Sequence, residues 1–389
     1  MDFYQFSVPT RIVFGNGLAR DFAAELDSIP AQKYFVITDK VILSLKLADP
    51  IIEGIKKSGR EVTGIFADVP PDSGIKVIEA ASLAAKLSGA EGIIAIGGGS
   101  VMDTAKGANI LFSLGGNLVE DYSGAQTITE ELCPLIAIPT TAGTGSEVTE
   151  AIVVLDDVTH TKLSFVDRHL LPTLAILDPE LTTGLPPQIT AATALDALTH
   201  AVEAVMSIQR GPVSDALAFQ AVSLIFKNLE TALAEPKNLE ARGALLVASN
   251  LAGIAFNHSM VGVVHSVAHT VGALFRVHHG TANGIFLPYG MEYNCEVREK
   301  EVASLAPFVG VGAIHELPLP RAKQCIEAVT ALRARIKKIC GLPTSLREVG
   351  VKKEDLLQIA KKAPDDGSSF YNPRPVTEED LLPYLEKAW

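Results

Sequence analysis

Apolar residues in the first half of the chain form short continuous runs, separated by polar and glycine-containing segments. Runs of this length predict strands that are buried on both faces. Between several of them, apolar positions recur at the three- and four-residue spacing of a helix. This alternation predicts a parallel sheet covered by helices on both faces. The predicted strands are 34–38, 62–66, 92–96, 135–138 and 173–177, and the predicted helices are 51–57, 75–87 and 101–111.

The pattern changes after Gly184-Leu185-Pro186-Pro187. Before this point, β-branched residues on either side of Asp156 and Asp157 predict a hairpin over 151–166. Beyond it, segments rich in Ala and Leu have helical spacing and few β-branched clusters. We therefore predict an α/β domain over 1–185 and an all-helical domain over 186–389. The predicted helices of the second domain are 191–206, 215–233, 241–256 and 320–338.

Composition restricts the class of protein. The 389 residues include 45 Asp and Glu against 33 Lys and Arg, so the net charge is −12, and 48% of the residues are apolar. With a mean hydropathy of +0.26 the chain is expected to be globular. The acidic balance argues against nucleic-acid and anionic-membrane partners, which bind clusters of basic side chains.

The sequence shows no clear membrane-spanning or signal segment and no cysteine spacing typical of disulfides. The apolar stretch 244–256 is short and interrupted by Asn250, so no transmembrane segment is expected, and residues 1–5 lack the features of a signal peptide. The four cysteines lie far apart without a CxxC pair. We therefore expect a cytoplasmic protein without disulfides or a cysteine zinc site.

A glycine-rich loop follows the predicted strand 92–96. Gly97, Gly98, Gly99 and Ser100 lead directly into the predicted helix 101–111. Glycines at a strand-to-helix junction allow backbone N–H groups and the positive end of a helix dipole to approach a phosphate. The alternative is an ordinary tight turn with Ser100 as the helix N-cap.

A second run of small and hydroxyl residues, 139–147, follows the predicted strand 135–138. Ligands of open parallel sheets bind beyond the carboxyl ends of the strands, so the two loops could converge on one dinucleotide. Asp39 comes just after strand 34–38 and could bind the ribose hydroxyls of a dinucleotide. Its carboxylate would repel a 2′-phosphate, which favours NAD over NADP. The alternative is that Asp39 is an ordinary turn residue. Because this acid precedes the glycines, the predicted Rossmann-like domain is a variant of the standard fingerprint.

The helical half contains a set of Asp and His residues at metal-ligand spacing. Asp196 and His200 are four residues apart, as are His265 and His269, and His278-His279 follows shortly after. Residues four apart share a helix face, so each pair can point at one ion. Imidazole and carboxylate without thiolate suit Fe(II), Zn(II), Mn(II) or Co(II), and these ligand types do not choose among them. A single histidine in such a helix is more often a hydrogen-bonded core residue.

These motifs resemble the iron-containing (group III) alcohol dehydrogenases, and within them the lactaldehyde reductase and 1,3-propanediol dehydrogenase branch. The resemblance runs nearly end to end. It rests on PTRIVFG from Pro9, GGGSVMDTAK from Gly97, PTTAGTGSEVT from Pro139, DALTHAVE from Asp196, AGIAFNHS from Ala252, HSVAHTVGALFRVHHG from His265 and NPRPVT from Asn372. The family has an N-terminal dinucleotide-binding domain and a C-terminal helical domain that binds the metal. The role of the NPRPVT segment is not evident.

The resemblance implies roles for individual residues. It implies His269 as a catalytic proton relay that does not ligate the metal. It implies a substrate-pocket role for Phe256, which is otherwise ordinary helix core, and for Ala151, at a position where the family often has Asn. The implied metal ligands are Asp196, His200, His265 and His279, and the implied cofactor-binding residues are Asp39, Gly97, Gly98, Gly99, Ser100, Asp103, Thr140, Thr141, Thr144, Thr149 and Lys162.

The expected function is NAD(H)-linked interconversion of short-chain primary alcohols or diols and their aldehydes, with the substrate oxygen on Fe(II). The expected assembly is a homodimer or larger homo-oligomer. A glycerol dehydrogenase-like zinc enzyme is the nearest alternative. A dehydroquinate-synthase-like lyase would need a dense set of basic residues for its polyanionic substrate, and a non-enzymatic sensor would need an effector segment; neither is evident in the sequence.

Overall fold

The computed structural model describes residues 4–156, 161–311 and 320–389, which form two compact units. The first unit contains residues 7–141 and 145–183. The second contains residues 4–6, 142–144 and 184–389. The second unit thus includes two short segments from the region predicted as the α/β domain.

The first unit is built around a six-stranded parallel sheet with the order β1-β9-β6-β4-β2-β3. A small second sheet has the order β5-β8-β7, in which β7 and β8 form the predicted antiparallel hairpin. The predicted turn at Asp156 and Asp157 lies partly outside the described residues. The strands are β1 Arg11–Phe14, β2 Lys33–Ile37, β3 Glu61–Phe66, β4 Gly92–Gly97, β5 Gly124–Ala125, β6 Leu135–Pro139, β7 Ala151–Asp156, β8 Thr161–Val166 and β9 Leu174–Leu177.

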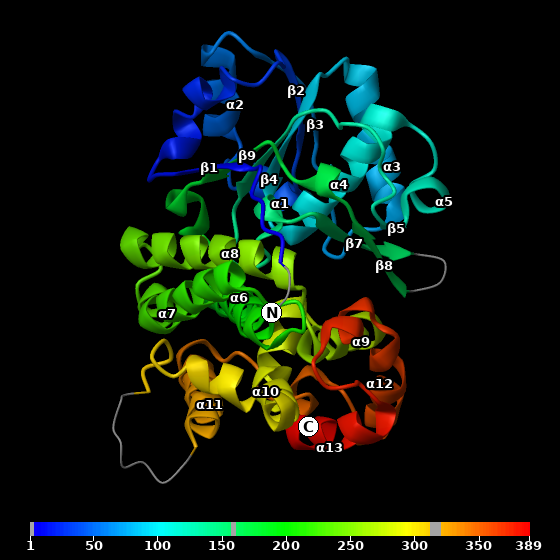
Figure 1. The fold of residues 1–389 in the computed structure, drawn as a ribbon. Coiled ribbons are helices and arrows are strands. Elements are labelled where there is room, and N and C mark those ends of the chain that lie inside the picture. Colours follow the sequence, from blue (N-terminus) through cyan, green and yellow to red (C-terminus); the bar gives the residue numbers. More distant parts are fainter. Residues whose placement is uncertain (1–3, 157–160, 312–319) are drawn as a thin grey trace. The chain divides into compact units, whose positions relative to one another are not determined.

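Alternate residues of the central strands face opposite sides of the large sheet. In β4, Ile93 and Ala95 pack in one cluster with residues of α3 and α4, whereas Ile94 and Ile96 pack in another with residues of α2. Figure 1 shows helices on both faces of this sheet. Because helices cover both faces of the sheet, its strands are almost uniformly apolar. The helices of this unit are α1 Lys40–Ser44, α2 Asp49–Lys57, α3 Ile75–Ser88, α4 Gly99–Leu114 and α5 Leu118–Tyr122.

The second unit is helical throughout its described part, as predicted (Figure 1). By length and composition alone, its helix α8 could cross a membrane. However, 67% of its most apolar 18-residue stretch is buried within the fold, which is typical of a core helix. The helices are α6 Pro187–Met206, α7 Pro212–Ala234, α8 Leu239–Ser259, α9 Val263–Phe275, α10 His279–Ser304, α11 Arg321–Cys340, α12 Leu356–Lys362 and α13 Glu378–Ala388.

Candidate functional site

The two small-residue loops lie side by side at the carboxyl edge of the parallel sheet. The backbone N–H of Thr140 donates to the carbonyl of Gly97 at 3.0 Å. A Cβ atom placed on Gly98 would lie 3.2 Å from the side chain of Thr141, so the loops are in direct contact. Helix α4 begins at Gly99, and its N-cap, Gly98, supplies no side-chain hydrogen bond. The first amides of α4 are therefore available to an anion.

Ser100 is not the N-cap of α4, in contrast to the alternative considered from the sequence. It lies inside the first turn, and its hydroxyl accepts a 3.2 Å hydrogen bond from the backbone N–H of Asp72. Asp72 also pairs with Lys162, whose Nζ lies 3.0 Å from its Oδ1. The structure thus connects Ser100 and Lys162 through one segment of the same unit.

Asp39 is the N-cap of α1. Its Oδ1 accepts hydrogen bonds from the backbone N–H groups of Val41 and Ile42 at 2.8 and 2.9 Å. This is the turn role considered from the sequence. A cap of this kind occupies one carboxylate oxygen, so Asp39 can serve as a cap and still present its charge at the carboxyl end of β2.

Asp103 and Thr149 both contact other parts of the protein. Asp103 accepts from the Ser146 hydroxyl and from the backbone N–H of Val153, both at 3.2 Å. Thr149 accepts from Nζ of Lys106, which lies 2.7 Å from its carbonyl oxygen and 3.2 Å from its hydroxyl. These contacts support a role for Asp103 and Thr149 in positioning the second loop.

The sequence analysis missed Lys106, although it is the last residue of the GGGSVMDTAK motif. Its side chain is almost completely buried. Burial lowers the pKa of Lys106 to about 8, against the opposing effect of Asp103. The signal in the sequence was a single lysine in an otherwise apolar part of a helix. Its ammonium also donates to the carbonyl of Ala151 at 3.3 Å, so it fixes the start of β7.

The remaining predicted cofactor residues differ in how deeply they are buried and in which of the two compact units they belong to. Thr140 is buried and Thr141 is half-buried, and both belong to the first unit. Thr144 is half-buried and belongs to the second unit. Next to it, a Cβ atom on Gly143 would lie 2.7 Å from the side chain of Thr193, so this segment packs tightly on α6.

Three of the four predicted metal ligands converge in the second unit. One ligand atom from each of Asp196, His265 and His279 lies within 4.8 Å of the others. Asp196 comes from α6, His265 from α9 and His279 from the start of α10. Asn283, which the sequence analysis missed, donates from Nδ2 to Asp196 Oδ1 at 2.6 Å. The same nitrogen lies 3.2 and 3.0 Å from Nε2 of His265 and His279, so the three ligand atoms surround one point.

The fourth predicted ligand, His200, lies on the same face of α6 as Asp196. Its ring stacks on that of His265 with centroids 4.6 Å apart. Its Nδ1 is buried without a hydrogen-bond partner among the described residues. Burial lowers the pKa of His200 to about 3, so the imidazole is neutral at physiological pH. A neutral imidazole is the form of histidine that binds metals, although His200 lies outside the group of three converging ligand atoms.

Asp196 is ionised in this surrounding. Burial alone would raise the pKa of Asp196, but the adjacent His279, His200 and His265 and the hydrogen bond from Asn283 lower it to about 2. One carboxylate with neighbouring imidazoles matches the donor preference of divalent first-row metals. The residues present therefore fit a metal ion.

A close approach of two helices brings His279 to Asp196. A Cβ atom on Gly280 would lie 2.2 Å from the carbonyl oxygen of Ala192 in α6. Only glycine permits this approach. One turn later, a Cβ atom on Gly284 would meet side-chain atoms of Leu195 instead of backbone. His278, which the ligand chemistry alone did not distinguish from His279, is instead the N-cap residue of α10.

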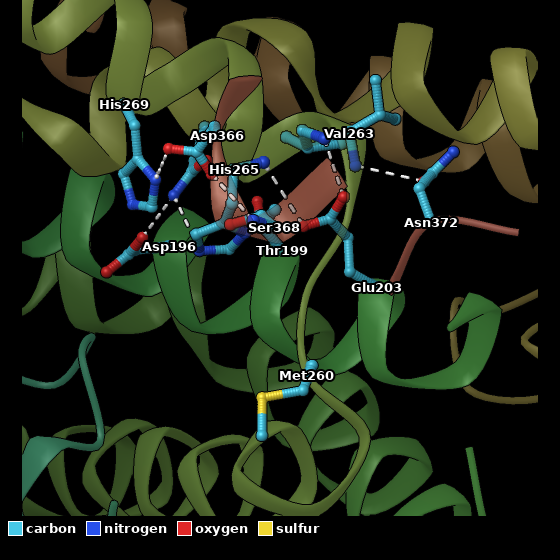
Figure 2. A network of polar contacts seen from close by, with 12 residues as sticks. Asp196, Thr199, Glu203, Met260, Val263, His265, His269, Asp366, Ser368 and Asn372 are labelled. Carbon is cyan, nitrogen blue, oxygen red and sulfur yellow. Dashed lines mark hydrogen bonds and ion pairs between the residues drawn. The ribbon is translucent and has the colours of Figure 1, made fainter. Parts of the chain in front are cut away.

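His269 and Phe256 also lie beside the ligands. The ring of His269 stacks on that of His279 at 5.1 Å, and the Phe256 ring stacks on that of His200 at 4.2 Å. His269 Nδ1 lies 2.9 Å from Oδ2 of Asp366, which the sequence analysis missed (Figure 2). Burial alone would raise the pKa of Asp366, but His269 lowers it to about 2. Ala151 belongs to the other unit, and its predicted pocket role stays a prediction.

Comparison with known proteins shows the class of protein that combines such glycine-rich loops with such an Asp and His cluster. The family model described as iron-containing alcohol dehydrogenase matches residues 9–179. The model described as Fe-containing alcohol dehydrogenase family, C-terminal, matches residues 190–389. The chain is thus an oxidoreductase that acts on alcohols or aldehydes.

Full-length relatives agree with this class. The chain is 36% identical to 1,3-propanediol dehydrogenase of Klebsiella pneumoniae, over 99% of both chains. It is 33% identical to lactaldehyde reductase of Escherichia coli (strain K12), over 97% of both. A crystal structure of a 1,3-propanediol oxidoreductase superposes with a TM-score of 0.94 at 35% identity and covers all of both chains. The chain belongs to the iron-containing alcohol dehydrogenase family, which confirms the resemblance and the fold class inferred from the sequence.

Proposed function

We propose that this chain is an iron-dependent, NAD(H)-linked enzyme that interconverts short-chain primary alcohols or diols and their aldehydes, with aldehyde reduction as its main direction. The observation that carries the proposal is the convergence of Asp196, His265 and His279, with His200 stacked beside them. The names of relatives that act on propanediol, lactaldehyde and methanol support small substrates.

Asp196, His200, His265 and His279 would hold the metal. When bound, the ion supplies a Lewis acid that polarises a carbonyl oxygen or favours the alkoxide of an alcohol. Helix α6 provides two of these side chains four residues apart, and packing at Gly280 brings His279 to them. Nitrogen and oxygen ligands allow both iron and zinc, and the family favours iron.

The loops at the carboxyl edge of the first unit would hold the dinucleotide. When bound, the nicotinamide ring supplies or accepts the hydride. Gly97, Gly98, Gly99 and Ser100 present the N-terminus of α4 to the phosphates, which explains how an acidic protein binds an anionic cofactor. The Asp39 charge would disfavour a 2′-phosphate and so select NAD.

His269 is proposed to transfer the proton. Its Nδ1 is held by Asp366 at 2.9 Å, which leaves Nε2 for proton exchange with the substrate oxygen, directly or through water. The Asp366 carboxylate would stabilise the imidazolium that forms when Nε2 is protonated.

Phe256 is proposed to limit substrate size. Its ring covers one face of the His200 ring. Substrates with a bulky group beside the reacting carbon would meet this ring, which supports a preference for short chains. We further propose a cytoplasmic location, with which the dispersed cysteines agree, and a homodimer or larger homo-oligomer, which the family resemblance implies.

The test is anaerobic oxidation of NADH by metal-stripped enzyme reloaded with Fe(II), Zn(II) or no metal. The aldehyde panel should include lactaldehyde, propanal and 3-hydroxypropanal, with glycerol and NAD as the reverse-direction test of a glycerol dehydrogenase. We expect turnover of the short aldehydes that depends on metal and is greatest with Fe(II). Equal turnover without metal, or activity only with glycerol and Zn(II), would refute the proposal.

A further inference from the structure

Glu203 is a buried acid at the end of the DALTHAVE motif, and neither the sequence analysis nor the proposed function gives it a role. It lies in α6, seven residues after Asp196 and three after His200, and its side chain is 1% exposed. Its Oε2 lies 2.6 Å from Nδ1 of His265. Figure 2 shows the Glu203 side chain directed from α6 toward the start of α9.

The same carboxylate also caps α9. Its Oε1 accepts from the backbone N–H of Val264 at 2.7 Å, and Oε2 lies 3.4 Å from that of His265. The first N–H of the helix, from Val263, donates to Oδ1 of Asn372 at 3.1 Å. The N-cap residue is Gly262, where a Cβ atom would lie 3.2 Å from Glu203 and 2.6 Å from Asn372. The amides that a helix start normally leaves unpaired are thus bound by these two side chains.

These contacts fix which nitrogen of His265 carries the proton. A carboxylate only accepts hydrogen bonds, so Nδ1 of His265 is the donor to Glu203. The lone pair is then on Nε2, the atom that faces Asn283 with Asp196 and His279 around it. An imidazole binds a metal through the nitrogen that lacks a proton, and its other nitrogen sets the tautomer.

We propose that Glu203 is a positioning residue that holds His265 in the Nδ1–H tautomer and so prepares Nε2 as a metal ligand. The inference rests on the proposed metal site. Asp196 and Glu203 together carry two negative charges, which balance a divalent cation within an otherwise apolar helix pair. The N-terminus of α9 stabilises the Glu203 charge before metal binds.

Glu203→Gln tests the proposal because glutamine keeps the shape and loses one acceptor. If its oxygen stays on Val264, its NH₂ group faces Nδ1 of His265, and that ring must carry its proton on Nε2, the metal-binding atom. We expect the affinity of the metal-free protein for Zn(II), measured by competition with a chromophoric chelator, to fall about 10- to 100-fold. Glu203→Asp, which keeps the charge, should recover part of this loss.

Asp167→Asn is the matched control, because it removes a buried carboxylate that lies 2.8 Å from Nδ1 of His169, and neither residue is a proposed ligand. Its Zn(II) affinity should equal that of the unaltered protein. Equal affinity of Glu203→Gln and the unaltered protein overturns the role of Glu203 and leaves the metal site intact. Failure of the unaltered protein to bind Zn(II) or Fe(II) refutes the proposed function itself.

A second measurement does not depend on the folding of Glu203→Gln. Nitrogen NMR of the ¹⁵N-histidine-labelled, metal-free protein distinguishes protonated from unprotonated ring nitrogens, and His265→Ala identifies the His265 signals. We expect a protonated Nδ1 and an unprotonated Nε2 at neutral pH. A protonated Nε2 would overturn the proposal.

Discussion

Gly280→Ala is expected to damage the metal site through helix packing alone. The new Cβ atom would lie 2.2 Å from the Ala192 carbonyl oxygen, and real Cβ contacts are essentially never closer than 3.0 Å. The start of α10 must therefore move from α6 by about 0.8 Å. Because the clash is with backbone, no side chain can rotate to relieve it. Metal–ligand distances tolerate only about 0.2 Å, so His279, the preceding residue, leaves its place beside Asp196.

The expected result is a stability loss of about 1–3 kcal/mol, typical of overpacking, together with at least tenfold weaker metal binding. Thermal unfolding of the metal-free protein and Zn(II) competition measure the two effects separately. Gly284→Ala is the milder comparison, since its Cβ atom would lie 2.7 Å from Leu195 Cδ1, which can rotate away, and 3.2 Å from Leu195 Cβ, which has to shift by only a few tenths of an ångström. That variant should keep its metal affinity. Unchanged affinity in Gly280→Ala would refute the packing argument.

Three other variants test the remaining parts of the site. His265→Ala should abolish metal binding and turnover while NAD affinity, measured by fluorescence titration, survives; a fully active variant would contradict the ligand assignment. Asp39→Ser keeps an N-cap for α1 but removes the charge. The kcat/KM with NADP should therefore rise relative to the kcat/KM with NAD. An unchanged ratio of the two would show that Asp39 does not face the ribose. Asp366→Asn should lower the free energy of unfolding by about 2 kcal/mol at about pH 4–5. This follows because about 1.36 kcal/mol corresponds to each unit by which His269 holds the Asp366 pKa below its usual value. Since a lowered carboxyl pKa stabilises the folded state only where the group is ionised, denaturant titrations should show the deficit shrinking as the pH falls from 4 toward 2, and a constant deficit would contradict it.

The buried strands of the first unit could be predicted because both of their faces are covered, which leaves a continuous apolar run. Strands β2, β4 and β6 lie within a residue or so of the predicted ranges. The sequence analysis missed β1, a strand without a fully buried residue, because its apolar run Ile12-Val13-Phe14 is only three residues long. It also did not delimit α10, which contains Pro288 and three glycines, residues that argue against a helix unless tertiary packing requires them.

The candidate site could be predicted where its residues are close in sequence. The pair Asp196 and His200 follows from helical spacing, and so does the placement of His265 and His269 on one face. Glu203, Asn283 and Asp366 could not be predicted in the same way, because their roles depend on contacts between different helices. Their signal in the sequence is only an acid or amide within an apolar or glycine-rich motif.

The most direct test of the account is metal reconstitution of one enzyme preparation. Metal-stripped protein is titrated anaerobically with Fe(II), and NADH oxidation with lactaldehyde is followed after each addition. The account predicts negligible turnover without metal, a linear rise and a plateau at one equivalent per chain, with none of this in Asp196→Ala. Full turnover in the stripped enzyme, or an unchanged titration in Asp196→Ala, would contradict the assignment of the metal centre.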